Sequence, residues 1–188
     1  QWQKYGIFQK DETIYQGKTK TKTGEIWNIT YAPKDVSQLD QPWEYPLDIL
    51  QETSDWAVIN KPTGMSVHPS LSETSNQTLV NALINHYGKD LAPQTEEVDG
   101  LSIPKLGIIH RLDKTTSGVI IIAKNLETLQ HFQKHWSEVE KNYYALVHGI
   151  PPKKGIIEAG IIRDPQQRLR MTVSDSQNAK PAKTEFER

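Results

Sequence analysis

The stretch LGIIHRLDKTTSGVIIIA, residues 106–123, places a polar loop between two apolar runs. Short runs rich in β-branched residues and bounded by turn residues are typical of buried strands, so we expect strands at Ile108–Ile109 and Val119–Ala123. The loop between them carries an imidazole, a guanidinium, a carboxylate and three hydroxyls. Such groups often lie on loops held by a rigid scaffold. A plain polar connection, whose Asp113 forms an ion pair or caps a turn, accounts for the same residues.

The elements on either side of this stretch follow from the same signals. Strands are predicted at residues 25–31, 47–50, 56–60, 143–147, 156–162 and from 183 onward. Helices are predicted at 78–87 and 126–137, where apolar residues, Leu126 and Leu129 among them, recur with helical spacing and face inward. Gly88 and Asn125 are expected to cap these helices. Residues 34–46 are predicted to be a linker and 89–104 a polar loop.

The order of these elements indicates the fold class. Strands and helices mix without strict βαβ alternation, which favours an α+β fold with a mixed, mainly antiparallel sheet and flanking helices. A chain of 188 residues suffices for one domain, or for one domain and part of another. We place a domain boundary near residue 45. Residues 1–45 are then an N-terminal extension or the tail of a small domain, because this piece is too short to bury its own core.

The composition excludes several classes of protein. The chain has no cysteine, which excludes disulfides, thiolate zinc sites and cysteine nucleophiles. No apolar run approaches the roughly 18 residues of a transmembrane helix, and no secretory signal opens the chain, so we expect a cytoplasmic protein without a membrane partner. His131 and His135 have the spacing of a helical metal pair, but no third ligand is evident and no metal is expected.

The net charge of −1 conceals an uneven distribution. Residues 1–100 hold 8 Lys and Arg against 14 Asp and Glu, whereas residues 101–188 hold 14 against 9, including all five Arg. Such asymmetry raises the question of a polyanionic partner. A basic cluster within residues 153–170, which includes Arg168, is a candidate phosphate-contacting surface, although a solvated face explains it as well.

Four segments resemble the motifs of the RluA-type pseudouridine synthases. The first, His110-Arg111-Leu112-Asp113-x-x-Thr116-Ser117-Gly118, is similar to the family's signature. The others, in chain order, are Asn60-Lys61-Pro62-x-Gly64-x-x-x-His68-Pro69, Lys141-x-Tyr143-x-Ala145-x-Val147-x-Gly149 and Ala179-Lys180-Pro181-Ala182-x-Thr184. The resemblance covers about residues 46–188, and it is strongest with the subgroup that acts on large-subunit rRNA.

The resemblance implies the catalytic fold of these synthases and the isomerisation of specific uridines in structured RNA to pseudouridine. The reaction breaks the C–N glycosidic bond, rotates the uracil and forms a C–C bond through C5, so no cofactor is expected. Asp113 matches the family's catalytic carboxylate, and whether it attacks the sugar, attacks the base or assists another route stays open. Tyr143 matches the family's tyrosine, which stacks on uracil and can take the C5 proton. The alternative is a half-buried strand tyrosine, with Tyr144 on the opposite side in the core.

The same resemblance gives substrate-binding roles to further residues. Arg111 matches a residue that inserts into the RNA where the flipped base had been, which suits a planar cation. Pairing with a carboxylate is the alternative for Arg111. His110 and Thr116 are expected to support the loop, Thr116 through local hydrogen bonds. Lys61 and Pro62 are expected to shape the pocket floor beside it.

The partner implied by the resemblance is RNA, with rRNA first and tRNA as the alternative, and we expect a monomer. In the family, a third motif whose Arg pairs with the catalytic Asp follows the strand that begins here near Lys183. The catalytic domain at 46–188 is therefore expected to miss its C-terminal part, and residues 1–45 resemble the end of a small RNA-binding domain with its linker. The 188-residue chain alone is expected to be inactive or feebly active.

Two functions from other classes stay open. The first is a catalytically silent RNA-binding protein with the same fold, although such a protein need not keep both Asp113 and Tyr143. The second is a hydrolase that uses His110 and Asp113. It lacks a convincing nucleophile, such as a serine in a strand–turn–helix elbow.

Overall fold

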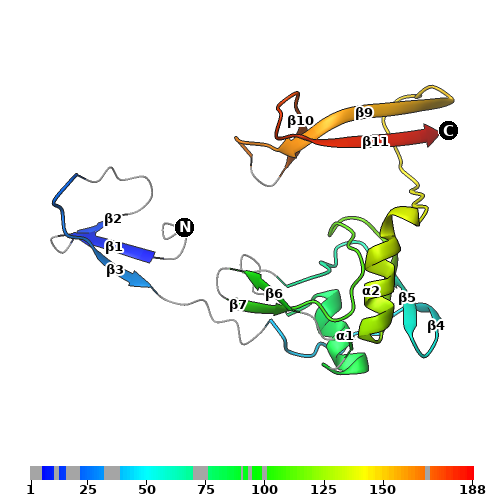
Figure 1. The fold of residues 1–188 in the computed structure, drawn as a ribbon, viewed down its shortest axis with the longest axis horizontal. Helices are drawn as coiled ribbons and strands as arrows, with labels where there is room; N and C mark the ends of the chain where they lie inside the picture. Colours follow the sequence, from blue (N-terminus) through cyan, green and yellow to red (C-terminus); the bar gives the residue numbers. More distant parts are fainter. Residues whose placement is uncertain are drawn as a thin grey trace. The chain divides into compact units, whose positions relative to one another are not determined.

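The computed structural model describes residues 6–10, 13–15, 22–31, 39–69, 76–89, 91–92, 95–98, 101–167 and 170–188. The chain divides into two compact units, Gln1–Val139 and Glu140–Arg188 (Figure 1). Arg168 of the basic cluster and residues 34–38 of the predicted linker lie outside the described residues. In the part of the chain that the structure describes, no helix is long and apolar enough to cross a membrane.

Three short strands near the N-terminus form an antiparallel sheet in the order β2-β1-β3. They are β1 (Gly6–Lys10), β2 (Thr13–Tyr15) and β3 (Asn28–Tyr31). Before β3, Gly24 adopts a φ of +89°, a conformation that favours glycine. Glu25 then pairs with Lys10 of β1 (Nζ–Oε1 2.8 Å). The strand predicted at 25–31 is therefore confirmed for residues 28–31.

The central sheet has the order β4-β5-β8 and is antiparallel throughout. Its strands are β4 (Ile49–Glu52), β5 (Trp56–Lys61) and β8 (Gly118–Ala123). The turn between β4 and β5 is closed by a hydrogen bond from the Thr53 N–H to the Trp56 carbonyl (2.9 Å). These strands confirm the predictions at 47–50, 56–60 and 119–123 with shifted ends. The apolar pair at 108–109 adds only one isolated bridge, between Ile108 and Ile122.

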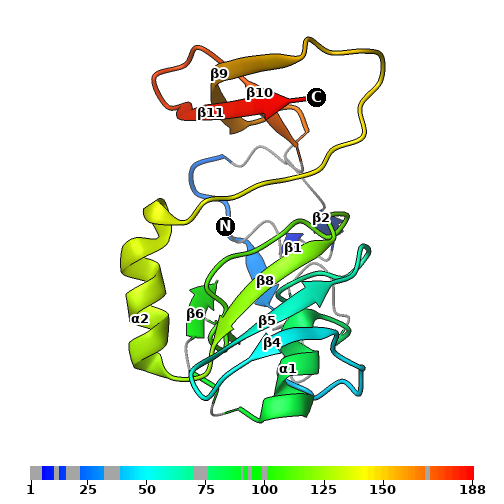
Figure 2. The ribbon, with the colours of Figure 1, turned by 90° about the vertical axis from the view of Figure 1, so that its right-hand side faces the viewer.

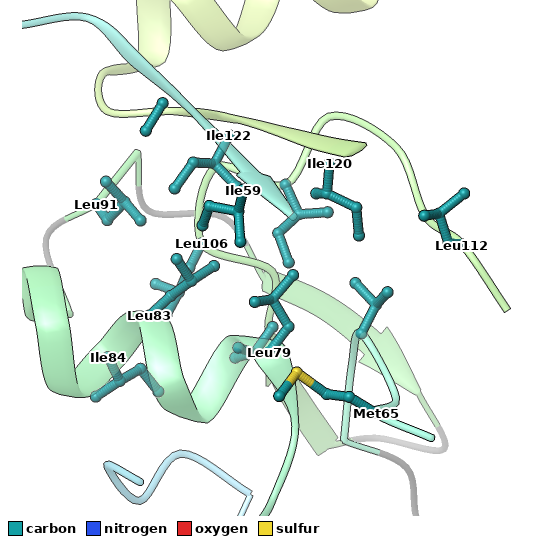
Figure 3. Close-up of a cluster of buried hydrophobic side chains, with 14 residues drawn as sticks. Ile59, Met65, Leu79, Leu83, Ile84, Leu91, Leu106, Leu112, Ile120 and Ile122 are labelled. Atoms are coloured by element: carbon teal, nitrogen blue, oxygen red, sulfur yellow. The ribbon is translucent and has the colours of Figure 1, made fainter. Parts of the chain in front are cut away.

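Helix α1 (Leu79–Tyr87) packs against the central sheet and closes the core (Figure 2). Thr78 caps its N-terminus, and Gly88 ends it at a φ of +85°, where the cap was predicted. Apolar side chains of the helix and of β5 and β8 point toward one another (Figure 3). Those that are at most 1% exposed include Ile59, Leu79, Val80, Leu83, Ile120 and Ile122. Removal of this apolar surface from water is the main force that holds the unit together.

Residues 39–45, which belong to the predicted linker, contact α1. The Asn81 side-chain amide donates to the carbonyls of Leu39 (3.2 Å) and Gln41 (2.7 Å). Leu39 is buried, and Trp43 and Tyr45 pack against the core. A buried amide whose two donors are both satisfied therefore ties this segment to the helix.

Helix α2 (Leu126–His135) begins at the predicted cap, because the Thr128 N–H donates to Asn125 Oδ1 (2.8 Å). A 3-10 turn at Trp136–Glu138 continues it. Leu129 is buried as predicted, whereas Leu126 is 47% exposed, so its predicted inward orientation is wrong. Side chains of a helix are tilted toward its N-terminus. Leu126 is the first residue of α2, so its side chain points beyond the end of the helix and away from the packed surface.

The prediction of a plain loop at 89–104 is wrong. Strands β6 (Thr95–Val98) and β7 (Leu101–Pro104) pair there as an antiparallel hairpin. The dipeptide between them is Asp99-Gly100, which is one of the strongest sequence signals for a two-residue hairpin turn.

Residues 140–188 contain one antiparallel sheet in the order β10-β9-β11. Its strands are β9 (Lys154–Arg163), β10 (Met171–Val173) and β11 (Lys180–Glu187). Strands β9 and β11 confirm two predicted strands, whereas β10 was not predicted. The predicted α+β class with mainly antiparallel strands is confirmed, because the described strands form four antiparallel sheets. An isolated parallel bridge outside these strands joins Ser66 and Thr78.

The strand predicted at 143–147 is wrong. Residues 140–147 have no regular secondary structure and are exposed. Tyr144 is 107% exposed, so its predicted place in a core is wrong as well. Strand propensity reflects the packing of side chains against neighbouring strands, and no described strand pairs with this segment.

Candidate active site

The loop that carries Asp113 is anchored in the core by the residue before it. Leu112 is 8% exposed and joins the main core cluster (Figure 3). Its neighbours Arg111 and Asp113 are both exposed. An apolar anchor between two charged residues fixes the backbone that carries them, while both charged groups stay in contact with water.

Pairing within the central sheet brings two of the four motif segments together. Lys61, the last residue of β5, lies opposite Gly118, the first residue of β8. The loop after β5 and the loop before β8 therefore leave the sheet at the same end. Gly64 and Gly118 have φ values of +84° and +126°, which a side chain would strain, so both glycines are required by the backbone.

Hydrogen bonds join these two loops next to Asp113. The Thr116 N–H donates to the Asp113 carbonyl (3.0 Å) and closes a turn. The Gly64 N–H donates to the Lys114 carbonyl (2.7 Å), and Thr63 Oγ1 donates to the carbonyl of Thr115 (2.8 Å). The turn is thus held by one bond of its own and by two bonds from the other loop.

Lys61 is fully buried beneath this site. Its ammonium donates to the carbonyls of Pro62 (2.8 Å) and Met65 (2.9 Å). Burial lowers the pKa of Lys61, and the charge of Asp113 acts in the opposite direction. The structure therefore brings Lys61 within electrostatic range of Asp113, and the lysine shapes the loop from inside.

His110 is fixed on two sides at the start of the loop. Its ring stacks on Trp136 (centroids 4.6 Å apart, planes 22° apart), and Nε2 accepts a hydrogen bond from the Ile121 N–H (3.1 Å). The Ile109 N–H donates to the Ile121 carbonyl. Ile121 of β8 is therefore bonded through its carbonyl to the backbone of residue 109 and through its N–H to the imidazole of His110. A lone pair used in this way is not free to take a proton from a nucleophile, which speaks against the hydrolase alternative.

Tyr143 lies in the other unit, Glu140–Arg188. It is 67% exposed and belongs to the segment without regular secondary structure. The predicted site residues that lie together on the two joined loops are thus Lys61, Pro62, His110, Arg111, Asp113 and Thr116.

Sequence reasoning missed two residues of this arrangement, Thr63 and Trp136. Thr63 occupies the variable position of the Lys-Pro-x-Gly segment, and no pattern marks it. Trp136 falls within the helix predicted at 126–137, and no contact with His110 was predicted for it. The spacing of His131 and His135 has a local explanation, because His135 Nδ1 lies 2.8 Å from the His131 carbonyl. No group of three or more metal-binding side chains occurs among the described residues.

The fold and the site define an α+β domain that presents a carboxylate on a turn fixed between two loops. Residues 55–188 match the family described as RNA pseudouridylate synthase, and the chain belongs to this family. The ribosomal large subunit pseudouridine synthase D of Nitrosomonas europaea is 35% identical over 187 residues, which cover 98% of this chain and 51% of that protein. An uncharacterized RNA pseudouridine synthase of Aquifex aeolicus is 37% identical over 183 residues, covering 96% and 54%.

The chain spans about half the length of these curated relatives. Among solved structures, the human RNA pseudouridylate synthase domain containing 1 is similar over 74% of this chain and 51% of its own, with a TM-score of 0.49 and 19% sequence identity.

Proposed function

We propose that this protein isomerises uridine in RNA to pseudouridine, with Asp113 as the ionised carboxylate of the reaction. The observation that carries the proposal is a signature turn held at several backbone positions while its carboxylate stays exposed. An exposed carboxylate on a fixed turn can meet a base that has left its stack. Membership of the RNA pseudouridylate synthase family supports this reaction class.

The proposed reaction balances without a cofactor. The bond between N1 of uracil and C1′ of the ribose breaks, the base rotates, and a bond forms between C5 and C1′. C5 then loses a proton and N1 gains one, so nothing is oxidised or reduced. Asp113 assists the bond changes at C1′ or at the base. Tyr143, which is 67% exposed, is our candidate for stacking on uracil and for accepting the C5 proton.

RNA is the proposed partner, and rRNA is the preferred class. The name of the Nitrosomonas europaea relative refers to the ribosomal large subunit, and we extend that substrate class to this protein. Arg111 is exposed beside Asp113 and is proposed to occupy the gap left by the flipped base, where a guanidinium can stack and donate at once. Transfer RNA is the second substrate class in the test below.

The test is tritium release from RNA labelled at uridine C5, measured with the full-length protein. Ribosomal RNA transcripts and tRNA are offered separately, and RNA binding is measured in parallel. We expect release with the wild type and none above background with Asp113→Asn, while binding is retained. Asp175→Asn is the matched control, because it makes the same change at an exposed carboxylate in the other unit.

The outcomes separate the open functions. Binding without release from either RNA contradicts the enzyme and favours a catalytically silent RNA-binding protein. Loss of binding with Asp113→Asn contradicts the catalytic role, because it assigns the carboxylate to the structure of the loop.

A neighbouring pair of tyrosines tests the second catalytic residue. Tyr143→Phe and Tyr144→Phe remove one hydroxyl each from adjacent exposed positions. We expect the first to lower the rate of tritium release at least about tenfold, as for the loss of a general base, and the second to leave it unchanged. Equal rates in both variants would remove Tyr143 from the mechanism.

A further inference from the structure

The loop after β5 supplies two consecutive donors to the turn that follows Asp113. Thr63 Oγ1 donates to the Thr115 carbonyl (2.8 Å), and the Gly64 N–H donates to the Lys114 carbonyl (2.7 Å). These acceptors are the two central carbonyls of the turn. Both bonds therefore act on the second and third peptide groups after Asp113, and they join positions about fifty residues apart in the chain.

These bonds bear on orientation more than on fold stability. Thr63, Asp113 and Thr115 are exposed, so water can satisfy the same carbonyls when a donor is removed. Water does not hold a carbonyl in one direction, whereas two adjacent donors on one turn do. Turn types differ in the orientation of their central peptides. A change in the orientation of either peptide group alters the turn, and the backbone of Asp113 moves with the turn.

We propose that Thr63 is a positioning residue for Asp113. This inference rests on the proposed function, because it assumes that the Asp113 carboxylate is the reacting group. Catalytic groups have to be held within fractions of an ångström, and a small displacement lowers the rate without loss of binding. Thr63 acts through the backbone of the turn, so its removal lowers kcat and leaves KM for the RNA unchanged.

Thr63 is the member of the donor pair that can be tested. The Gly64 amide cannot be removed by substitution, and its φ of +84° makes any side chain there a source of strain. Thr63→Val keeps the branched shape and removes the hydroxyl. Thr63→Ser keeps the hydroxyl and removes the methyl group. Thr172→Val repeats the first change in β10, at a residue with no assigned catalytic or binding role, and serves as the control.

Two measurements are made on the full-length protein. The first is kcat and KM for tritium release from the RNA substrate. We expect Thr63→Val to lower kcat about two- to fivefold, the loss of one exposed hydrogen bond, with Thr63→Ser close to the wild type. The second is hydrogen exchange at the Thr116 amide, which closes the turn (3.0 Å to the Asp113 carbonyl). We expect faster exchange there in Thr63→Val alone, with an unchanged Tm.

Three results would overturn the proposal. The first is a Thr63→Val variant whose kcat and Thr116 amide exchange rate both equal those of the wild type. The second is a Thr63→Ser variant whose kcat is as low as that of Thr63→Val. The third is a raised KM with unchanged kcat, which would assign Thr63 to RNA binding. If the wild type releases no tritium from any RNA, the proposed function fails. The exchange rate of the Thr116 amide tests the inference about Thr63 separately, and an unchanged rate in Thr63→Val would show that Thr63 does not hold the turn.

Discussion

Residues 39–139 and residues 140–188 are held together in different ways. The first region surrounds a core in which large aliphatic side chains such as Leu83 and Ile120 are fully buried. In the second region no described residue is buried, and large apolar side chains such as Ile157 (58% exposed) and Val173 (68%) face water. Both regions contain a three-stranded antiparallel sheet, so strand pairing alone does not produce a core. The difference is a second layer, which α1 supplies only to the first sheet.

The sheet of residues 140–188 is nevertheless patterned for burial on one face. Paired residues share a face, so the β9–β11 register places Ile157, Ala159 and Ala182 together, and Phe186 lies against Gly155. Ion pairs fall on the other face, between Lys183 and Glu158 (3.8 Å) and between Lys183 and Glu185 (3.1 Å). These exposed pairs contribute little, because water and salt screen them. The stability of this sheet therefore depends on its backbone ladder.

The largest expected effect comes from a matched pair of core and sheet truncations. Leu83→Ala removes a fully buried side chain between α1 and the central sheet, and we expect it to lower the free energy of unfolding by about 2–5 kcal/mol. Ile157→Ala removes a mostly exposed one, with an expected cost of about 0.5 kcal/mol or less. Hydrogen exchange of β5 and β8 peptides, compared with β9 and β11 peptides, measures each effect locally. Equal losses of unfolding free energy in the two variants would contradict the conclusion that only the first region has a buried core.

A pair of lysines sharpens the comparison through charge. Lys61→Met removes a buried ammonium and leaves the Pro62 and Met65 carbonyls without their donor, which we expect to cost about 1–3 kcal/mol. Lys183→Met removes an exposed ammonium from its ion pairs and should change stability by roughly 0.5 kcal/mol or less. Thermal unfolding of both variants checks this. A Lys61→Met protein as stable as the wild type would show that the buried ammonium does not stabilise the loop.

Two histidines extend the test to the candidate site. His110→Ala leaves the Ile121 N–H without its acceptor and removes the stack on Trp136, with an expected loss of roughly 1–2 kcal/mol and faster exchange in the Asp113 loop. His148→Ala, at an exposed position of the other unit, should leave both quantities unchanged. His110→Phe keeps a ring for Trp136 and removes the acceptor. Exchange as slow as in the wild type in His110→Phe would assign the support to stacking alone.

The same contrast explains how much the sequence predicts. Local signals were sufficient where an element carries its own caps and apolar face, as in α1 with Gly88 and α2 with Asn125. They failed at 143–147, where strand propensity has no partner strand to satisfy it. The hairpin at 95–104 could have been predicted, because Asp99-Gly100 marks it.

The candidate site was predicted in its parts and not in its assembly. The motif residues around Asp113 and Lys61 could be recognised one segment at a time. That they meet depends on the pairing of Lys61 with Gly118, a long-range contact of the sheet register. The bond from Thr63 to Thr115 depends on the same register and on one hydroxyl at a position that no pattern marks.

The smallest expected effect is a dependence of stability on pH in the first region. A side-chain hydrogen bond from Lys124, and a second from Tyr87, hold the pKa of Glu52 below its ordinary value of 4.5. Because the pKa is lower in the folded state, the stabilisation is present above the unfolded-state pKa and is lost as the pH falls through the folded-state value. Glu52→Gln should therefore reduce the Tm near neutral pH and lose that difference in acid. Glu185→Gln, on the exposed sheet of residues 140–188, is the control. It shows how the Tm changes when a carboxylate without a buried neighbour is removed. A Tm difference between Glu52→Gln and the wild type that persists unchanged in acid would show that packing, and not the charge, links Glu52 to Tyr87 and Lys124.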